Sequence, residues 1–187
     1  HHADKSRKGT TIYDEGLRIP VVKLYDRGVL VKDVMDLIML NFQMKYERHG
    51  DLNAQIITNQ FGADKLVELI DKIGLDTYDE FCIKWLEYGE RKARLAITEL
   101  PDGEYHFEDF LDDGAGNKNL LIKTRITIKG DSITFDFTGT CRQVSGPYNC
   151  VPCALKATVY YSMMSILDNT IPANSGFFES INIIAEP

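Results

Sequence analysis

Residues 131–161, DSITFDFTGTCRQVSGPYNCVPCALKATVYY, place a strand, a polar loop and a helix in succession. The strand alternates apolar and polar residues, and its apolar face consists of Ile133, Phe135 and Phe137. The loop contains Gly139 and Gly146, and glycine permits tight backbone paths close to a ligand or another chain. The helix has an apolar stripe at four-residue spacing: Val151, Leu155, Val159 and Met163. We interpret this stretch as a binding corner, which by itself names no function.

Further strands flank this stretch. Apolar positions at Tyr105, Phe107 and Phe110 predict a strand, and residues 120–128 predict another. Lys129-Gly130-Asp131 suits a tight turn into the strand at 132–137, so we expect a three-stranded antiparallel meander. After the helix, a loop at 171–177 leads into a final strand at 181–185.

The region before Pro101 is predicted to be helical. The first helix spans 29–46 and has a methionine-rich apolar stripe, which we interpret as core filling. The second spans 50–73, with Asp51 as its cap, a buried apolar side and Gly74 as its end. The buried side consists of Leu52, Ile56, Leu66, Leu69, Ile70 and Ile73.

A capping box formed by Thr77 and Glu80 predicts the start of a third helix. The short connection at Gly74 favours an antiparallel pair of the second and third helices. The predicted fold class is α+β: a helical hairpin region at about 29–100, followed by an antiparallel sheet with a packed helix.

The composition and charge of the chain argue against some classes of partner. The 187 residues carry a net charge of -7, which argues against a nucleic-acid partner. No apolar run is long enough to span a membrane, so no membrane partner is expected. Four cysteines in a chain of this length do not indicate a disulfide framework, and we expect a reduced, cytoplasmic protein.

Five pieces of the chain, in order, resemble the hydantoinase B/oxoprolinase family. They are HHAD at 1–4, EGLRIPVVKLY at 15–25, GDLNAQ at 50–55, LPDGEYHFEDFLDD at 100–113, and DFTGT at 136–140 with GPYN at 146–149. Because these pieces lie inside a longer subunit in the family, the resemblance implies that residues 1–187 form a single partial domain from its middle portion. The segment after HHAD departs from the family's glycine-rich pattern, which leaves the geometry near Asp4 open.

The resemblance implies an ATP-dependent hydrolase that opens a cyclic amide such as hydantoin or 5-oxoproline. ATP would phosphorylate the amide oxygen, and a metal- or carboxylate-activated water would attack the carbonyl carbon. No phosphate-binding loop occurs here, so ATP would be bound first by a hydantoinase A-like partner in a hetero-oligomer.

The site residues are also carried over from the resemblance. His1 and His2 are candidate ligands of a divalent metal such as Mg, Mn or Zn. Asp4 and Glu15 are the candidate catalytic carboxylates, with Asp4 alternatively orienting a histidine. From the residues alone, the histidines could equally be a tag remnant or surface groups, and Glu15 could form a surface ion pair with Arg18.

Three other functions stay open. Relatives in the same superfamily carboxylate ketones such as acetone or acetophenone with ATP. The chain could also be a non-catalytic scaffold segment of such a complex. Finally, Cys150 and Cys153 form a C-x2-C pair typical of zinc or thiol-redox sites, although no second pair is present.

Overall fold

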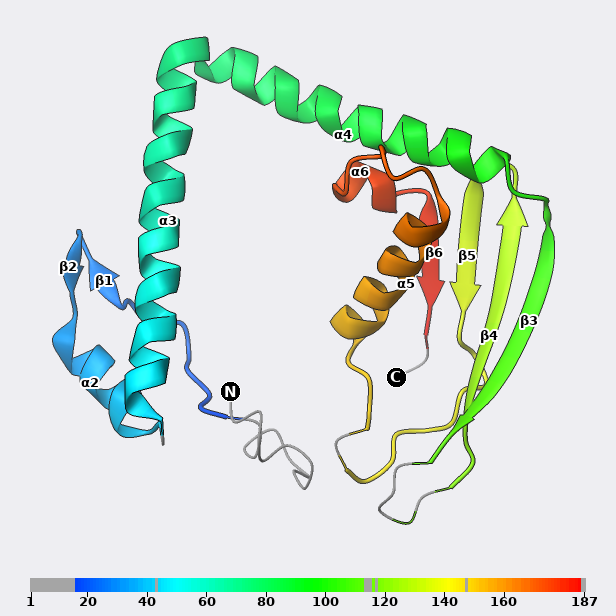
Figure 1. The fold of residues 1–187 in the computed structure, drawn as a ribbon, viewed down its shortest axis with the longest axis horizontal. Helices are drawn as coiled ribbons and strands as arrows, with labels where there is room; N and C mark the ends of the chain where they lie inside the picture. The colour runs from blue at the N-terminus through cyan, green and yellow to red at the C-terminus, as the bar shows by residue number, and fades with distance from the viewer. Residues whose placement is uncertain (1–15, 43, 113–115, 117, 147, 186–187) are drawn as a thin grey trace. The chain divides into compact units, whose positions relative to one another are not determined.

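The computed structural model describes residues 16–42, 44–112, 116, 118–146 and 148–185 (Figure 1). The chain divides into two compact units, residues 1–75 and 76–187. The elements combine helices with a sheet, which confirms the α+β class. That residues 1–187 form a single partial domain stays a prediction.

The first unit contains a short hairpin that the sequence analysis missed. Strands β1 (Tyr25–Asp26) and β2 (Val29–Leu30) pair antiparallel. The two residues between them have positive φ angles, 50° for Arg27 and 82° for Gly28. A two-residue turn with both φ angles positive matches the right-handed twist of paired strands. The predicted helix start at Val29 is therefore wrong, because Val29 is used for strand pairing.

Helix α2 (Lys32–Leu40) follows this hairpin. Its buried residues are Met35 and Ile38, which agrees with methionine as core filler. Leu37, predicted in the same stripe, is 63% exposed.

Helix α3 (Lys45–Ile73) begins five residues earlier than predicted. Asp51 therefore lies within the helix and pairs with Arg48 at 2.9 Å, so its prediction as a cap is wrong. The predicted end is confirmed: Gly74 adopts φ 85° and its N–H donates to the Ile70 carbonyl at 2.7 Å. The predicted buried side is wrong, since no α3 residue is buried among those the structure describes.

Helix α4 (Leu75–Thr98) opens the second unit. Thr77 lies inside it, and Glu80 pairs with Lys84 at 2.5 Å, so the predicted capping box is wrong. Its buried residues are Gly89, Ala93 and Ile97. The antiparallel pairing of α3 with α4 stays a prediction.

A four-stranded sheet in the order β3-β4-β5-β6 lies in the second unit. Its strands are β3 (Gly103–Leu111), β4 (Leu120–Lys129), β5 (Ser132–Asp136) and β6 (Ile181–Ile184). The predicted meander of β3, β4 and β5 is confirmed, and Gly130 in its turn has φ 59°. The sheet is mixed rather than antiparallel throughout, because β6 pairs parallel with β5.

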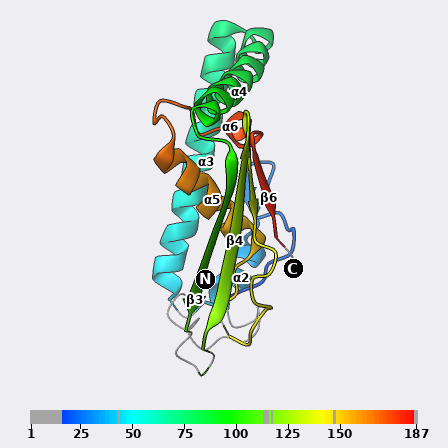
Figure 2. The ribbon, with the colours of Figure 1, turned by 90° about the vertical axis from the view of Figure 1, so that its right-hand side faces the viewer.

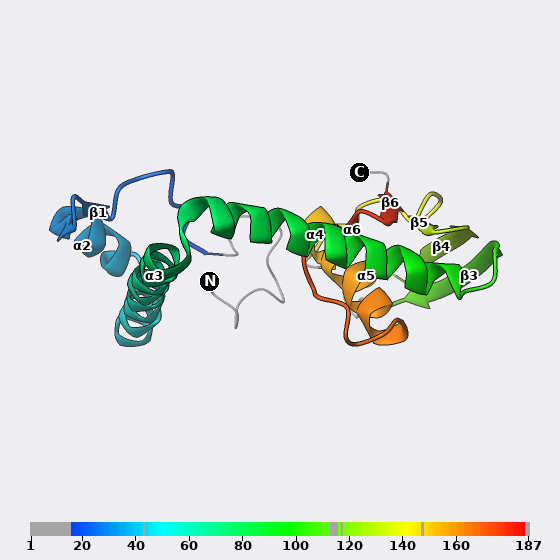
Figure 3. The same ribbon diagram turned by 90° about the horizontal axis from the view of Figure 1, so that it is seen from above.

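A parallel pair needs a crossover, and here α5 (Pro152–Ile166) and α6 (Ser175–Phe178) supply it. Figure 2 shows α5 against one face of the sheet. Figure 3 shows α4 passing over the end of the sheet where β4 turns into β5.

The hydrophobic core of the second unit lies between the helices and the sheet. It consists of Ala93, Ile97, Ile128, Ile133, Phe135, Val159, Met163, Ile171, Phe177 and Ile181. Of the predicted α5 stripe, Val159 and Met163 are buried and Val151 is 57% exposed.

No helix in the described ranges is long and apolar enough to cross a membrane.

Candidate functional site

The metal and catalytic candidates lie outside the described residues. His1, His2, Asp4 and Glu15 all fall in residues 1–15, for which the structure provides no geometry. Their roles therefore stay predictions.

Within the described part of the chain, no group of three or more His, Cys, Asp or Glu side chains could hold a metal ion. Cys141, Cys150 and Cys153 are all exposed free thiols. The thiol of Cys150 makes only a long contact, 3.7 Å, with the carbonyl oxygen of Val151. The C-x2-C pair thus has no further ligand among the described side chains, and a zinc site there finds no support.

The predicted binding corner starts where β5 ends, at Asp136. This carboxylate is 6% exposed and forms an ion pair with Arg125 on β4. Its Oδ1 also accepts a 2.9 Å hydrogen bond from the backbone N–H of Thr138. Hydrogen bonds from the Thr138 side chain and backbone, together with Arg125, lower the pKa of Asp136 from 3.8 to about 2. Asp136 is therefore ionised at working pH and anchors the turn; it is not available as a general acid.

The turn then passes along β4, beyond the point where β5 stops pairing. The Thr140 hydroxyl donates to the Lys123 carbonyl and accepts from the Lys123 N–H, both at 3.1 Å. The Cys141 N–H donates to the Leu121 carbonyl at 2.9 Å. Gly139 makes this path possible, since its φ is 93° and its position lies close to the Lys123 side chain. Residues 138–141 are thus fixed to β4 by hydrogen bonds that leave their outer surface open.

Asn149 organises the loop that follows. Its Oδ1 accepts from the Val144 N–H at 2.9 Å, and its Nδ2 donates to the carbonyls of Val144 at 2.7 Å and Gly146 at 3.0 Å. The loop enters α5 with Pro152 in the first turn, where a missing N–H costs little. The exposed polar side chains of this corner are Arg142, Gln143, Ser145 and Tyr148.

The described part of this corner has groups suited to binding a ligand. It offers one cation, an amide, hydroxyl groups and backbone N–H groups around a fixed turn. Such groups can accept a polar ligand through hydrogen bonds. Nothing among them forms a nucleophile–base pair.

A second fixed point joins the loop at 171–177 to α4. The side-chain amide of Asn174 donates to the Trp85 carbonyl at 2.9 Å, and its Oδ1 accepts from the Phe177 N–H at 3.2 Å. Gly89 and Gly176 allow the approach, because a Cβ on either would overlap the Asn174 amide or the Leu86 carbonyl, respectively. The sequence predicted that this loop places the backbone but did not predict its partner. Gly89, inside an otherwise strong helix, was the available signal for a close contact.

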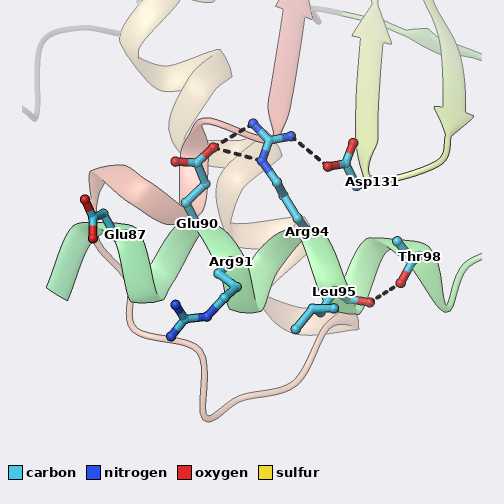
Figure 4. Close-up of a pocket in the computed structure, with 7 residues that line it drawn as sticks. All are labelled: Glu87, Glu90, Arg91, Arg94, Leu95, Thr98 and Asp131. Carbon is cyan, nitrogen blue, oxygen red and sulfur yellow. Dashed lines mark hydrogen bonds and ion pairs between the residues drawn. The ribbon is translucent and has the colours of Figure 1, made fainter. Parts of the chain in front are cut away.

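The surface also has an open depression of about 460 Å³ between α4 and the turn from β4 to β5 (Figure 4). At its centre Arg94 pairs with Glu90 at 2.8 Å and with Asp131 at 3.5 Å. The hydrogen bond that Arg94 donates to the Glu90 carboxylate is the main cause that raises the pKa of Arg94. Arg91 projects from the other side of α4, 5.8 Å from the Tyr88 ring centre. Because Arg94 is already bonded to two carboxylates, we assign this network to holding α4 on the sheet.

Comparison with known proteins defines the family. The model of the hydantoinase B/oxoprolinase family matches residues 3–187, so the chain belongs to this family. It is 36% identical to a protein of Pseudomonas sp. strain NS671 assigned as the B subunit of a D-/L-hydantoinase, over 92% of this chain and 31% of that protein. It is also 30% identical to the beta subunit of the caprolactamase of Pseudomonas jessenii, over 94% of this chain and 30% of that protein.

Solved structures share the fold. The ATP-dependent caprolactamase of Pseudomonas jessenii aligns with 97% of this chain and 31% of its own, with a TM-score of 0.87 and 29% identity. A nucleotide-free acetone carboxylase aligns with 95% of this chain and 25% of its own, with a TM-score of 0.81 and 16% identity. The second likeness concerns the fold alone. The chain spans about a third of the length of the curated hydantoinase and caprolactamase relatives that it matches.

Proposed function

We propose that this chain is part of a subunit of an ATP-dependent cyclic-amide hydrolase that opens hydantoin or 5-oxoproline rings. The observation that carries the proposal is the match along 92% of the chain to a protein assigned as a hydantoinase component, at 36% identity. Further relatives, a caprolactamase component and a 5-oxoprolinase, also bear names of enzymes that act on cyclic amides.

The proposed reaction starts by activating an inert amide. The γ-phosphoryl group of ATP transfers to the amide oxygen, and ADP leaves. Water then adds to the electrophilic carbon and loses a proton to a carboxylate, for which Asp4 and Glu15 are the candidates. Breaking the ring C–N bond, with a proton taken up by the leaving nitrogen, gives an acyl phosphate. A second water then hydrolyses the acyl phosphate to the open-chain carboxylate and phosphate.

We propose His1 and His2 as ligands of a divalent ion, Mg, Mn or Zn, with imidazole favouring Zn among the three. The described residues contain no group of three or more His, Cys, Asp or Glu side chains that could hold such an ion without these histidines. When bound, a divalent ion would polarise an oxygen of substrate or water.

A partner of the hydantoinase A type is part of the proposal. Relatives are named as B, beta and delta subunits of their enzymes, which supports a hetero-oligomer. The ATP-binding function would lie first in that partner. A reduced, cytoplasmic setting is proposed with it.

The test is substrate-dependent ATP turnover by the full-length subunit together with its partner. Hydantoin, 5-oxoproline and caprolactam are screened beside acetone and acetophenone with bicarbonate, and ADP, phosphate and organic products are measured. We expect ring opening of a cyclic amide. If no cyclic amide stimulates ATP turnover or is ring-opened, the proposal is contradicted and a non-catalytic scaffold segment is favoured.

The metal ligands are tested separately. Replacing His1 and His2 together by alanine should remove the bound metal, measured by elemental analysis of the purified complex, and reduce turnover at least 100-fold. His106→Ala is the matched control, because His106 is exposed on β3 and its ring is paired with Glu104 at 2.8 Å. Retained metal in the double variant would reject these ligands.

ATP-dependent carboxylation of a ketone is the second candidate function. The observation that favours it is 27% identity, over 92% of this chain, to the acetophenone carboxylase delta subunit of Aromatoleum aromaticum. Turnover only with a ketone plus bicarbonate would select it.

A further inference from the structure

One face of the β3–β4 sheet is mainly charged and carries close pairs: Glu104 with His106 at 2.8 Å, Glu108 with Lys123 at 2.9 Å, and Arg125 with Asp136. The first two pairs are exposed, as is typical of a surface in contact with water, whereas Asp136 is buried. Phe110, opposite Leu121, is the exposed apolar residue at the far end of this face. The register places the next residue of each strand on the opposite face.

That opposite face begins as the protein's core and then continues uncovered. Its first rows, Ile128 beside Ile133 and Ile126 beside Phe135, belong to the core or pack against it. On the edge strand β3, starting opposite Ile126, and farther along β4, the same face carries four apolar side chains that are exposed. They are Tyr105 (43%), Phe107 (67%), Leu111 (39%) and Ile122 (42%). We call these four residues the apolar extension.

Tyr105 lies opposite Ile126 on the edge strand, and the other three residues of the apolar extension lie beyond the part of β4 that pairs with β5. Strand β5 pairs with β4 only from Arg125 to Lys129, and α5 covers that part of the sheet. Figure 1 shows β3 and β4 continuing past it. Several exposed apolar side chains gathered on one face are the usual mark of a packing interface, since scattered single residues are normal but clusters are not.

We propose that the apolar extension is the packing surface for a further segment of the same subunit, outside these 187 residues. The length of the relatives supports this occupant: the chain matches only 31% of the hydantoinase relative and 31% of the solved caprolactamase chain. The uncovered rows are also continuous with the chain's own core, as expected when one hydrophobic core extends through a larger protein. Asp109 lies on this face, opposite Ile122, so the segment is expected to bring a basic or hydrogen-bonding group toward it.

Cysteine accessibility in the full-length subunit tests the proposal. Phe107→Cys reports on the apolar extension, and His106→Cys, its neighbour on the charged face of β3, is the matched control. Tyr105→Cys and Glu104→Cys repeat the comparison two residues away. Each protein is treated with a maleimide, and the label is located by mass spectrometry so that the native thiols are distinguished.

We expect the thiols at 105 and 107 to react at least 100-fold more slowly than those at 104 and 106. The difference should hold in the subunit purified without its partner and should not depend on protein concentration. Equal rates on the two faces, fast or slow, would overturn the proposal. Protection that requires the partner, or that rises with concentration, would also overturn it by assigning the surface to a partner or to a second copy.

Discussion

The side-chain amide of Asn174 donates a 2.9 Å hydrogen bond to the backbone carbonyl of Trp85, 89 residues earlier in the chain. The same side chain accepts from the Phe177 N–H and so caps α6. The side-chain amide of Asn174 therefore caps the start of α6 and also holds α6 against α4. The crossover between β5 and β6 is tied to α4 through this residue.

Asn174→Ala should lower the free energy of unfolding by about 1–3 kcal/mol, since it removes the side-chain cap of α6 and the hydrogen bond to the Trp85 carbonyl. Urea denaturation of the full-length subunit, followed by circular dichroism, measures the loss. Asn169→Ala is the control, because Asn169 is exposed in the preceding turn. Equal effects of the two variants would show that the Trp85 contact contributes nothing.

Alanine at Gly89 or Gly176 should destabilise the fold by about 2 kcal/mol or more, because the new Cβ must displace packed atoms. Gly176→Ala should be the worse, since the atom it meets is the Leu86 backbone carbonyl, which cannot rotate away.

The controls are Gly50→Ala and Gly62→Ala in α3, where a Cβ meets nothing within 4 Å. These should leave stability unchanged or raise it by up to about 1 kcal/mol through better helix propensity. In thermal denaturation, the Gly89 and Gly176 variants should therefore unfold at a lower temperature than the unchanged protein. The Gly50 and Gly62 variants should unfold at an equal or higher temperature. A stabilising Gly89→Ala variant would contradict the described docking of Asn174.

Asp136 should make the free energy of unfolding depend on pH in the acidic range. Its pKa falls from 3.8 to about 2 on folding, so the unfolded chain binds more protons between these values. The stabilisation from ionised Asp136 is complete above pH 3.8 and is lost as the pH falls through about 2. Asp136→Asn should flatten the dependence of unfolding free energy on pH in this window.

Asp71→Asn, at an exposed position of α3, provides the comparison for that titration. Denaturation curves at several pH values between about 2 and 5 give the slopes. If the slope is the same in the Asp136 variant as in the unchanged protein, the hydrogen bonds from Thr138 and the ion pair with Arg125 do not stabilise the ionised carboxylate in the fold.

Asn149→Ala should loosen the loop at 144–149 without unfolding the sheet. It removes three hydrogen bonds, each contributing about 1 kcal/mol. Backbone amides of this loop should exchange with solvent about 10-fold faster or more, while β4 and β5 keep their protection. Gln143→Ala, an exposed neighbour, should leave exchange unchanged; similar exchange in both variants would contradict the organising role of Asn149.

The elements defined by local patterns were predictable from the sequence. Apolar positions at Tyr105, Phe107 and Phe110, the strand pattern of 120–128 and the turn at Gly130 led to the confirmed meander. The apolar stripe through Val159 and Met163 led to α5. The fold class followed from these together.

Two kinds of feature were not predictable. Some depend on contacts between residues far apart in the sequence, and others arise where a helix continues through a residue that carries a local cap signal. Asp51 and Thr77 carry local cap signals, but the helices continue through them. The hairpin at Arg27 needs a positive φ in a residue that seldom adopts it. Of the site, the anchoring of the corner by Asp136 and Asn149 required the three-dimensional structure, whereas the family motifs themselves were visible in the sequence.

The parallel pairing of β5 with β6 has a consequence for synthesis on the ribosome. About 45 residues separate the two strands, and at about 5–20 residues per second the edge of β5 stays open for about 2–9 s before its neighbour emerges. During that interval a nascent chain presents an unpaired strand rich in isoleucine and phenylalanine. Production of the soluble protein should therefore respond to translation speed and chaperone supply more than to the thermodynamic stability of the finished fold.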